Sequence, residues 1–305
     1  MTDLRPPSVP PGIPPVEHEV DESLVACLLR TRCPDLAGLP LKRTASGWDN
    51  QLFRLGDDLA VRLPRRQLGV DLIRKEQRWL PLLAPRLELP ISAPLHTFEA
   101  AADFPWPWSV VPWMHGATAE QQAPGAAEAG RYGRFLRALH QPPPPDAPRS
   151  PVRGVPLSRR EASVAARLER LAGRDTGVAS SPRQMRDAWL DAAAAPSDLP
   201  DTWIHGDLTP MNVIVRDGRL AGIIDWGDLC VGDAATDLAS AWFLFEEAEA
   251  VFAAYGPLSA ATRRRARGWA ILFGVLFLDT GLHADPRYAK LGQQLLNRVL
   301  AVSAG

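Results

Sequence analysis

The stretch TWIHGDLTPMNVIVRDGRLAGIIDWGD, residues 202–228, constrains this chain more than any other segment. It holds two carboxylates and a carboxamide at fixed intervals: Asn212 follows Asp207 by five positions, and Asp225 follows Asn212 by thirteen. The residues between them have the pattern of strand, turn and strand. Because the two ends of a hairpin meet at one edge, these three polar groups are expected to converge in space.

The composition is that of a globular protein with one large domain or two lobes. Of the 305 residues, 46% are hydrophobic, and 34 basic side chains balance 35 acidic ones to a formal net charge of −1. This balance disfavours nucleic acids and anionic membranes as partners, since both require a basic excess. The dense basic run at Arg263–Arg265 is interpreted as a solvated helix face.

The cysteines and the apolar segments indicate the cellular compartment of the protein. Cys27, Cys33 and Cys230 form no CxxC pair, which favours reduced thiols over a disulfide framework or a zinc site. The first residues lack the apolar core of a signal peptide. The longest apolar run, Trp269–Leu278, is too short to span a bilayer and predicts a buried helix. These features predict a cytoplasmic protein.

Residues 17–112 are predicted to form a small β-rich lobe behind a flexible, proline-rich tail at residues 1–16. Asp21 is expected to cap a helix at its start. Turn residues and alternation then predict strands, and apolar residues at i, i+3 and i+4 predict one helix among them. The expected strands are 41–47, 51–56, 57–64, 89–98 and 108–114, and the helix is 71–84.

Residues 113–305 are predicted to form a larger, mainly helical lobe in which the opening stretch is an embedded hairpin. Helical spacing is present at 129–140, 156–173, 182–195 and 234–256, through the 270s, and from Tyr288 onward. The predicted fold class is therefore α+β, with a small antiparallel sheet followed by a helical lobe.

The three groups of the opening stretch have the chemistry that phosphoryl transfer requires. Mg²⁺ prefers hard oxygen ligands and takes only one or two from a protein when phosphate and water supply the rest. Asn212 and Asp225 suit that role, while Asp207 lies across a turn and can face a substrate hydroxyl. Such a reaction depends mainly on positioning and charge neutralisation, with one base to receive the proton.

The same stretch resembles the catalytic loop of kinases. With Asp-x4-Asn, HGDL, IIDWGD and GDAATDLA, the chain is similar to the aminoglycoside phosphotransferase family, which includes macrolide and choline kinases. The resemblance implies a bilobal protein-kinase-like fold, Asp207 as catalytic base, and Mg²⁺ on Asn212 and Asp225. It also implies supporting roles for His205, which packs the loop, and Asp237, which binds the loop's backbone amides.

The resemblance further implies a site for ATP or GTP as the phosphoryl donor. Arg62 stands where kinases carry a lysine on the third strand, and Glu76 on the next helix is its expected partner. Arginine in place of lysine departs from the usual pattern. A guanidinium still binds phosphate oxygens in a bidentate manner, so the role is preserved chemically.

Two further segments are expected to contact the nucleotide. The loop from Ser46 to Asn50 would lie over the phosphates, although it lacks the three glycines of a protein kinase. The connector at Val111 and Trp113 would hold the purine through main-chain hydrogen bonds. Pro112 has no N–H, so the donor must come from a neighbour such as Trp113 or Met114. The sequence does not select between ATP and GTP.

The acceptor is predicted to be a hydroxyl of a small molecule, because the eight residues between Asp225 and the next helix are too few for a peptide-docking loop. Acidic candidates favour a polyamine such as an aminoglycoside: Asp228, Asp233, Glu246, Glu247 and Asp279. Aromatic candidates favour a bulkier macrolide: Trp226, Trp242, Phe243 and Tyr288.

The leading hypothesis is thus a kinase for an aminoglycoside-type antibiotic. The alternatives within the same chemistry are a macrolide or other antibiotic kinase and a metabolic kinase for an amino alcohol or sugar. A catalytically silent nucleotide-binding scaffold is disfavoured because Asp207, Asn212 and Asp225 are all present. A metal-dependent hydrolase using His205 lacks a second, suitably spaced histidine. The oligomeric state is left open.

Overall fold

The computed structural model describes residues 17–44, 49–283 and 285–301. The chain first builds an antiparallel sheet in the strand order β1-β2-β3-β5-β4. Leu55 of β2 lies opposite Leu59 of β3 across a short turn, and Arg62 of β3 lies opposite Ser109 of β5. The strands are β1 (Leu41–Arg43), β2 (Asn50–Leu55), β3 (Leu59–Pro64), β4 (His96–Phe98) and β5 (Trp108–Pro112).

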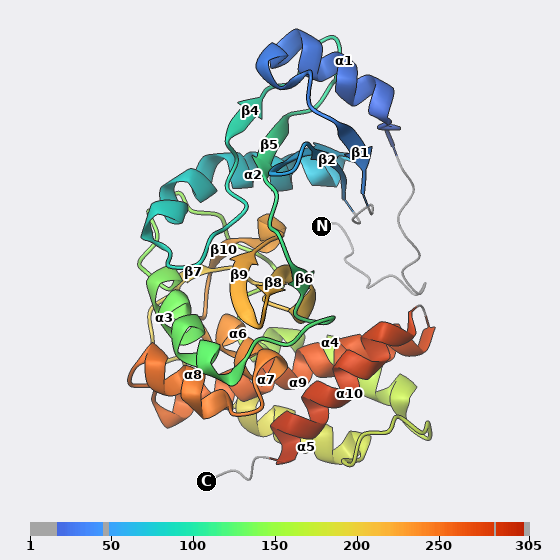
Figure 1. Ribbon diagram of the computed structural model, residues 1–305. Coiled ribbons are helices and arrows are strands. Elements are labelled where there is room, and N and C mark those ends of the chain that lie inside the picture. Colours follow the sequence, from blue (N-terminus) through green and yellow to red (C-terminus); the bar gives the residue numbers. More distant parts are fainter. Residues whose placement is uncertain (1–16, 45–48, 284, 302–305) are drawn as a thin grey trace.

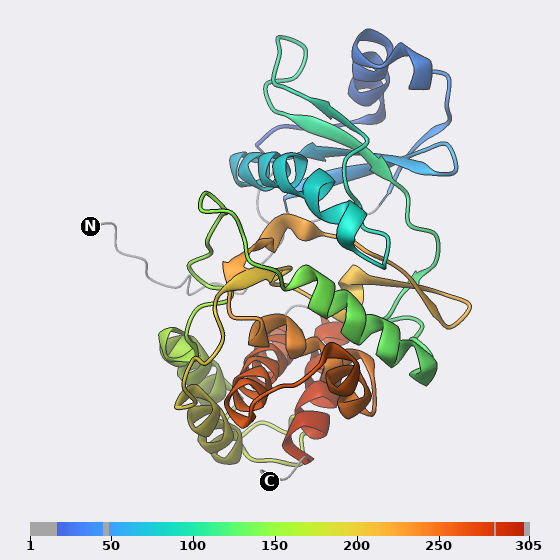
Figure 2. The same cartoon turned by 90° about the vertical axis from the view of Figure 1, so that its left-hand side faces the viewer.

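Two helices cover the two faces of this sheet (Figures 1 and 2). Helix α1 (Glu22–Arg32) begins where the Asp21 carboxylate accepts the Leu24 N–H, as its predicted cap role requires, and it packs on the apolar side of the sheet. Helix α2 (Gln67–Leu83) starts four residues before its predicted start. Its last turns bury Trp79 in the core of the helical part and so join the two regions.

The rest of the chain is mainly helical. Helix α9 lies at its centre, and the apolar run within α9 is buried, as predicted. Among the described residues, no helix is both long and apolar enough to cross a membrane. The helices are α3 (Ala129–Leu139), α4 (Glu161–Leu171), α5 (Pro182–Ala193), α6 (Ala235–Leu238), α7 (Ser240–Leu244), α8 (Ala248–Tyr255), α9 (Ala260–His283) and α10 (Pro286–Ala301).

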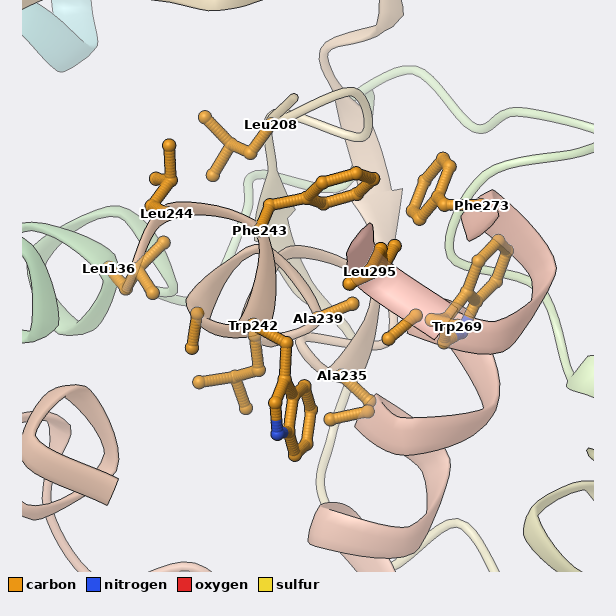
Figure 3. Close-up of a cluster of buried hydrophobic side chains, with 14 of the residues drawn as sticks. Leu136, Leu208, Ala235, Ala239, Trp242, Phe243, Leu244, Trp269, Phe273 and Leu295 are labelled. Atoms are coloured by element: carbon orange, nitrogen blue, oxygen red, sulfur yellow. The ribbon is translucent and has the colours of Figure 1, made fainter. Parts of the chain in front are cut away.

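The helical segment predicted at 234–256 is three short helices rather than one. The chain becomes extended at Phe245, with φ −128° and ψ 142°, between α7 and α8. The break lets α8 turn and pack closely on α3, where Gly133 leaves room for the backbone of Val251. Figure 3 shows the result in α7: Phe243 points toward Phe273, while Trp242 points the other way.

Two small sheets lie between the five-stranded sheet and the helices, and they carry residues 202–228. Strands β8 (Val213–Arg216) and β9 (Arg219–Ile223) form the predicted hairpin, with β6 (Ala117–Thr118) at the edge of β8. Asp217 and Gly218 form its turn with φ 53° and 75°, the left-handed conformation that Asp-Gly favours. Strand β7 (Thr202–Ile204) pairs instead with β10 (Cys230–Gly232).

Short 3-10 turns complete the chain: η1 (Pro34–Leu36), η2 (Ala84–Arg86), η3 (Ala126–Glu128), η4 (Leu157–Arg160), η5 (Pro210–Asn212) and η6 (Trp226–Asp228). An antiparallel N-terminal sheet followed by a helical C-terminal part confirms the predicted α+β class. Strand β5 ends at Pro112, where the chain leaves the five-stranded sheet.

Candidate active site

The loop between β7 and β8 is tied to α6 by one buried carboxylate. Asp237 accepts the backbone N–H of His205 at 2.7 Å on Oδ2 and that of Gly206 at 2.9 Å on Oδ1. Gly206 has φ +83°, and a Cβ there would lie 2.9 Å from the Asp228 carbonyl oxygen. The loop therefore needs glycine at this position, and Asp237 makes the contacts that the family resemblance implied for it.

His205 links this loop to the end of β9. It is fully buried, its Nδ1 accepts the Asp207 N–H at 3.2 Å, and its Nε2 donates to the Ile224 carbonyl at 3.1 Å. Its ring centroid lies 4.5 Å from that of Trp226. Both ring nitrogens are occupied by the backbone, so these contacts are those of a packing residue.

Asp207 and Asn212 meet directly across the turn η5. Asn212 Nδ2 donates to the Asp207 backbone carbonyl at 2.8 Å and to its Oδ2 at 3.0 Å. The other carboxylate oxygen, Oδ1, accepts from the guanidinium of Arg153 at 2.9 Å. Burial raises the pKa of the Asp207 carboxyl, and the Arg153 charge opposes that rise.

Arg153 is the residue of this site that the sequence did not reveal. It reaches Asp228 as well, with Nε 3.0 Å from Oδ2, so one guanidinium bridges two carboxylates. Its face lies over the Phe273 ring of α9, 5.2 Å from the centroid. Because Arg153 stands in a loop 54 positions before Asp207, no motif or periodicity marks it.

Asp225 follows β9 in a left-handed conformation, with φ 58° and ψ 69°. This conformation is uncommon for a residue with a side chain and costs on the order of 1 kcal/mol, and such strain is characteristic of functional sites. The preceding residue, Ile224, donates its N–H to the Asn212 backbone carbonyl at 2.9 Å, which ties the end of β9 to the residue before β8. The Asp225 side chain is 58% exposed.

The predicted partnership of Arg62 and Glu76 is present, with 3.2 Å between Nη2 and Oε1. Arg62 also contacts Asp225 Oδ1 at 3.1 Å, which the sequence did not predict. Burial raises the pKa of Glu76 to about 7, although the Arg62 charge acts to lower it. Arg62 thus links strand β3, helix α2 and the loop after β9.

The other residues predicted on the nucleotide side are buried or half-buried wherever the structure describes them. Ser46 lies outside the described residues. Asn50 is buried against the first turn of α2, where its Oδ1 would lie 3.1 Å from a Cβ on Gly69. Val111 is buried in the ladder with β3. Trp113 is a correction: its N–H donates to the Asp58 carbonyl at 2.7 Å, so it is not a free donor for a purine.

Two of the predicted acceptor-binding acids already have arginine partners. Arg265 binds the Asp233 carboxylate at 2.6 Å, and that carboxylate also accepts the Ala235 N–H at the start of α6. Asp279 is buried and held in bidentate fashion by Arg170, at 3.0 and 2.6 Å. Both residues are ion-pair partners within the chain, because long-range packing brings an arginine to each, and their role in binding the acceptor stays a prediction.

The remaining acceptor candidates separate into core and surface. Trp226, Trp242 and Phe243 are buried in the core. Glu246 is exposed at the break between α7 and α8, and within the described ranges no hydrogen bond or ion pair joins it to the site. Tyr288 is half-buried and lines a small hollow with Met211 of the turn η5, beside the loop that carries Asp207.

Lys75 is a second cation that the sequence did not single out. It is half-buried on α2, one position before Glu76, and burial lowers its pKa while the charge of Asp228 acts to raise it. Asp228 therefore lies close to two of the protein's own cations, Lys75 and Arg153. In the part of the chain that the structure describes, no three His, Cys, Asp or Glu side chains are grouped to hold a metal ion.

A catalytic-type loop fixed by a buried aspartate, beneath a five-stranded sheet with an Arg–Glu pair, defines the class of kinase-fold phosphotransferases. The family model described as "Phosphotransferase enzyme family" matches residues 40–269, which is most of the chain. The chain belongs to this family, and it is an enzyme of the kinase type, as predicted.

Solved structures show the same fold. The GDP complex of aminoglycoside 2'-phosphotransferase-IIIa superposes with a TM-score of 0.67 at 21% identity, covering 92% of this chain and 99% of that chain. ADP-bound aminoglycoside phosphotransferase APH(2'')-Ib gives 0.58 at 17% identity, over 92% and 99%. Macrolide 2'-phosphotransferase MphH from Brachybacterium faecium gives 0.57 at 21% identity, over 90% and 97%. No curated protein matched the sequence.

Proposed function

We propose that the protein transfers the γ-phosphate of ATP or GTP to a hydroxyl group of a small molecule, with Asp207 as the base. The observation that carries this proposal is the hydrogen-bonded Asp207–Asn212 pair, at 3.0 Å, beside a strained and exposed Asp225. One carboxylate is oriented by an amide and a guanidinium, while a second remains open to solvent. Phosphoryl transfer needs this division of labour.

The base is held for its task by its neighbours. Asn212 and Arg153 each take one oxygen of the Asp207 carboxylate, which restricts its rotation. The Arg153 charge counteracts the rise in pKa that burial causes, so it favours the ionised form that accepts a proton. The hydroxyl of the acceptor would approach this carboxylate from the side of η5 and α10.

The donor set suits Mg²⁺. Because Asn212 gives its Nδ2 to Asp207, its carbonyl Oδ1 is the atom left to face a cation. Arg62 binds only Oδ1 of Asp225, so Oδ2 is a second hard oxygen ligand. Asn212 and Asp225 would hold Mg²⁺ there, and the ion would supply positive charge to the phosphates of the donor. Arg62 stands next to this site on β3 and would contact the phosphates.

The aminoglycoside acceptor predicted from the sequence depended on free carboxylates. In the structure Asp228, Asp233 and Asp279 each face an arginine of the chain itself. A polyamine would have to displace these arginines to form the charge pairs that were expected. We therefore propose the reaction class without assigning an antibiotic.

An acceptor screen tests the proposal. Purified full-length protein is incubated with Mg²⁺, ATP or GTP and a panel of aminoglycosides, macrolides, sugars and amino alcohols. Release of nucleoside diphosphate and a gain of one phosphate in the acceptor's mass are the readouts. We expect turnover with at least one acceptor and no acceptor phosphorylation without Mg²⁺. Tight nucleotide binding with no turnover on any acceptor would favour a silent nucleotide-binding scaffold.

A further inference from the structure

Arg160 differs from the other arginines around the site. It is the last residue of η4 and is half-buried, and its Nε has no hydrogen-bond partner among the described residues. Within the same residues no carboxylate forms an ion pair with it. Its buried Nε–H is costly, because this N–H group loses water and gains no hydrogen bond in return.

Its nearest charged neighbours are also cations. Burial lowers the pKa of Arg160, and the charges of Arg153 and Arg167 add to that effect. Arg167 in turn faces Asp279, which Arg170 holds more closely. Among the described residues, the carboxylates that form ion pairs with this group of guanidiniums are each bound by Arg153, Arg167 or Arg170: Asp207, Asp228 and Asp279.

Part of this positive charge lies beside the base. Arg153 and Arg160 come from one short segment, and Arg153 touches the Asp207 carboxylate. Leu157, between them, packs on α9 near Gly268, which anchors the segment. An anion bound here would complete the hydrogen bonds of Arg160, and a guanidinium fork matches carboxylate or phosphate oxygens well.

We propose that Arg160, assisted by Arg153, binds an oxyanion group of the acceptor, so that the substrate is a hydroxyl compound carrying a carboxylate or a phosphate ester. The inference rests on the proposed phosphotransferase function and narrows its acceptor class. It predicts the opposite charge preference from the polyamine that the sequence suggested.

The first test measures oxyanion binding without any turnover. The midpoint of thermal unfolding is compared in sodium sulfate and in sodium chloride of equal ionic strength, for the wild type, Arg160→Gln and Arg159→Gln. Arg159 is the exposed neighbour and serves as the matched control. We expect sulfate to raise the midpoint in the wild type and the control by more than in Arg160→Gln. Equal gains in all three proteins would overturn the site.

The second test uses one sugar ring in several charge states: glucose, glucosamine, glucuronate and glucose 6-phosphate. Phosphorylation rates are measured with Mg²⁺ and ATP or GTP. Sugar binding is measured in parallel, in the presence of an analogue of ATP or GTP that cannot be hydrolysed. We expect the two anionic sugars to bind and react best. Comparison of glucuronate with glucose 6-phosphate then shows whether the site recognises a carboxylate or a phosphate group. In Arg160→Gln, the preference for anion over glucose should fall by about tenfold or more.

The two proposals fail separately in this design. If glucosamine is preferred, or if charge makes no difference to binding, the oxyanion inference is wrong even when sugars are phosphorylated. If anionic rings bind selectively through Arg160 but no phosphate is transferred to any acceptor, the site stands and the kinase proposal is wrong.

Discussion

Two arginines of the candidate site, Arg62 and Arg153, each stand between two carboxylates, and the two triads differ in what they join. Arg62 links Glu76 of α2 with Asp225 after β9, so it connects the sheet region with the helical part. The Arg153 triad, with Asp207 and Asp228, lies entirely in loops of the helical part.

The exposure of the carboxylates suits the two triads to different tasks. In the Arg62 triad the outer carboxylate, Asp225, is largely exposed and keeps one oxygen available for a ligand. In the Arg153 triad the bridged base has partners on both oxygens and is held by the chain alone. The first triad is therefore suited to open toward a nucleotide, and the second to hold a proton acceptor in one orientation.

The largest expected effect comes from removing the base of the Arg153 triad. Asp207→Asn should lower turnover by about 10²–10⁴-fold, because the amide cannot accept the hydroxyl proton. Nucleotide affinity, measured by calorimetry, should stay near the wild-type value. Asp217→Asn is the matched control, since Asp217 is exposed in the turn of the same hairpin. Full turnover in Asp207→Asn would exclude the base role.

The next effect concerns the exposed member of the Arg62 triad. Asp225→Asn should reduce turnover by on the order of a hundredfold, because it removes a charged metal ligand beside the phosphates. The fold should be retained, since asparagine tolerates the left-handed backbone. Titration of Mg²⁺ in the activity assay would show the loss as a higher metal requirement. An unchanged Mg²⁺ dependence would remove Asp225 from the metal site.

The buried member of the same triad predicts a pH-dependent stability. Glu76 has a folded-state pKa of about 7 against an ordinary 4.5, so the folded chain binds the proton more tightly. This contribution is fully present below pH 4.5 and is lost as the pH rises through 7. Between about pH 5 and pH 8 the free energy of unfolding should fall by roughly 2 to 3 kcal/mol from this group.

Urea unfolding of the wild type and Glu76→Gln at both pH values isolates that contribution, because other titrating groups are common to the two proteins. The variant should show a flatter pH dependence. If the free energies of unfolding of the two proteins differ by the same amount at both pH values, Glu76 stays ionised beside Arg62.

The smallest effect comes from the arginine of the second triad. Arg153→Gln removes the charge that lowers the pKa of Asp207, so the acidic limb of the kcat/KM profile should move to higher pH. Arg153→Lys keeps the charge and should move the limb less. If both variants follow the wild-type profile, Arg153 does not tune the base.

Much of the fold followed from local features of the sequence. Asp21 caps α1, the Asp217–Gly218 pair closes the β8–β9 hairpin, and the apolar run from Trp269 is buried in α9. The spacing of Asp207, Asn212 and Asp225 also predicted their convergence, because a hairpin brings its two ends together. These features depend on neighbours within a few residues or on one short hairpin, and a linear sequence displays them directly.

Only the tertiary structure decided which charges were already paired. Arg153 reaches Asp207 across 54 positions, and Arg170 reaches Asp279 across 109. The sequence therefore shows which side chains are acidic, but it does not show which of them are already paired with an arginine. An ion pair is set by where packed helices and loops bring two side chains, and no local pattern encodes that distance.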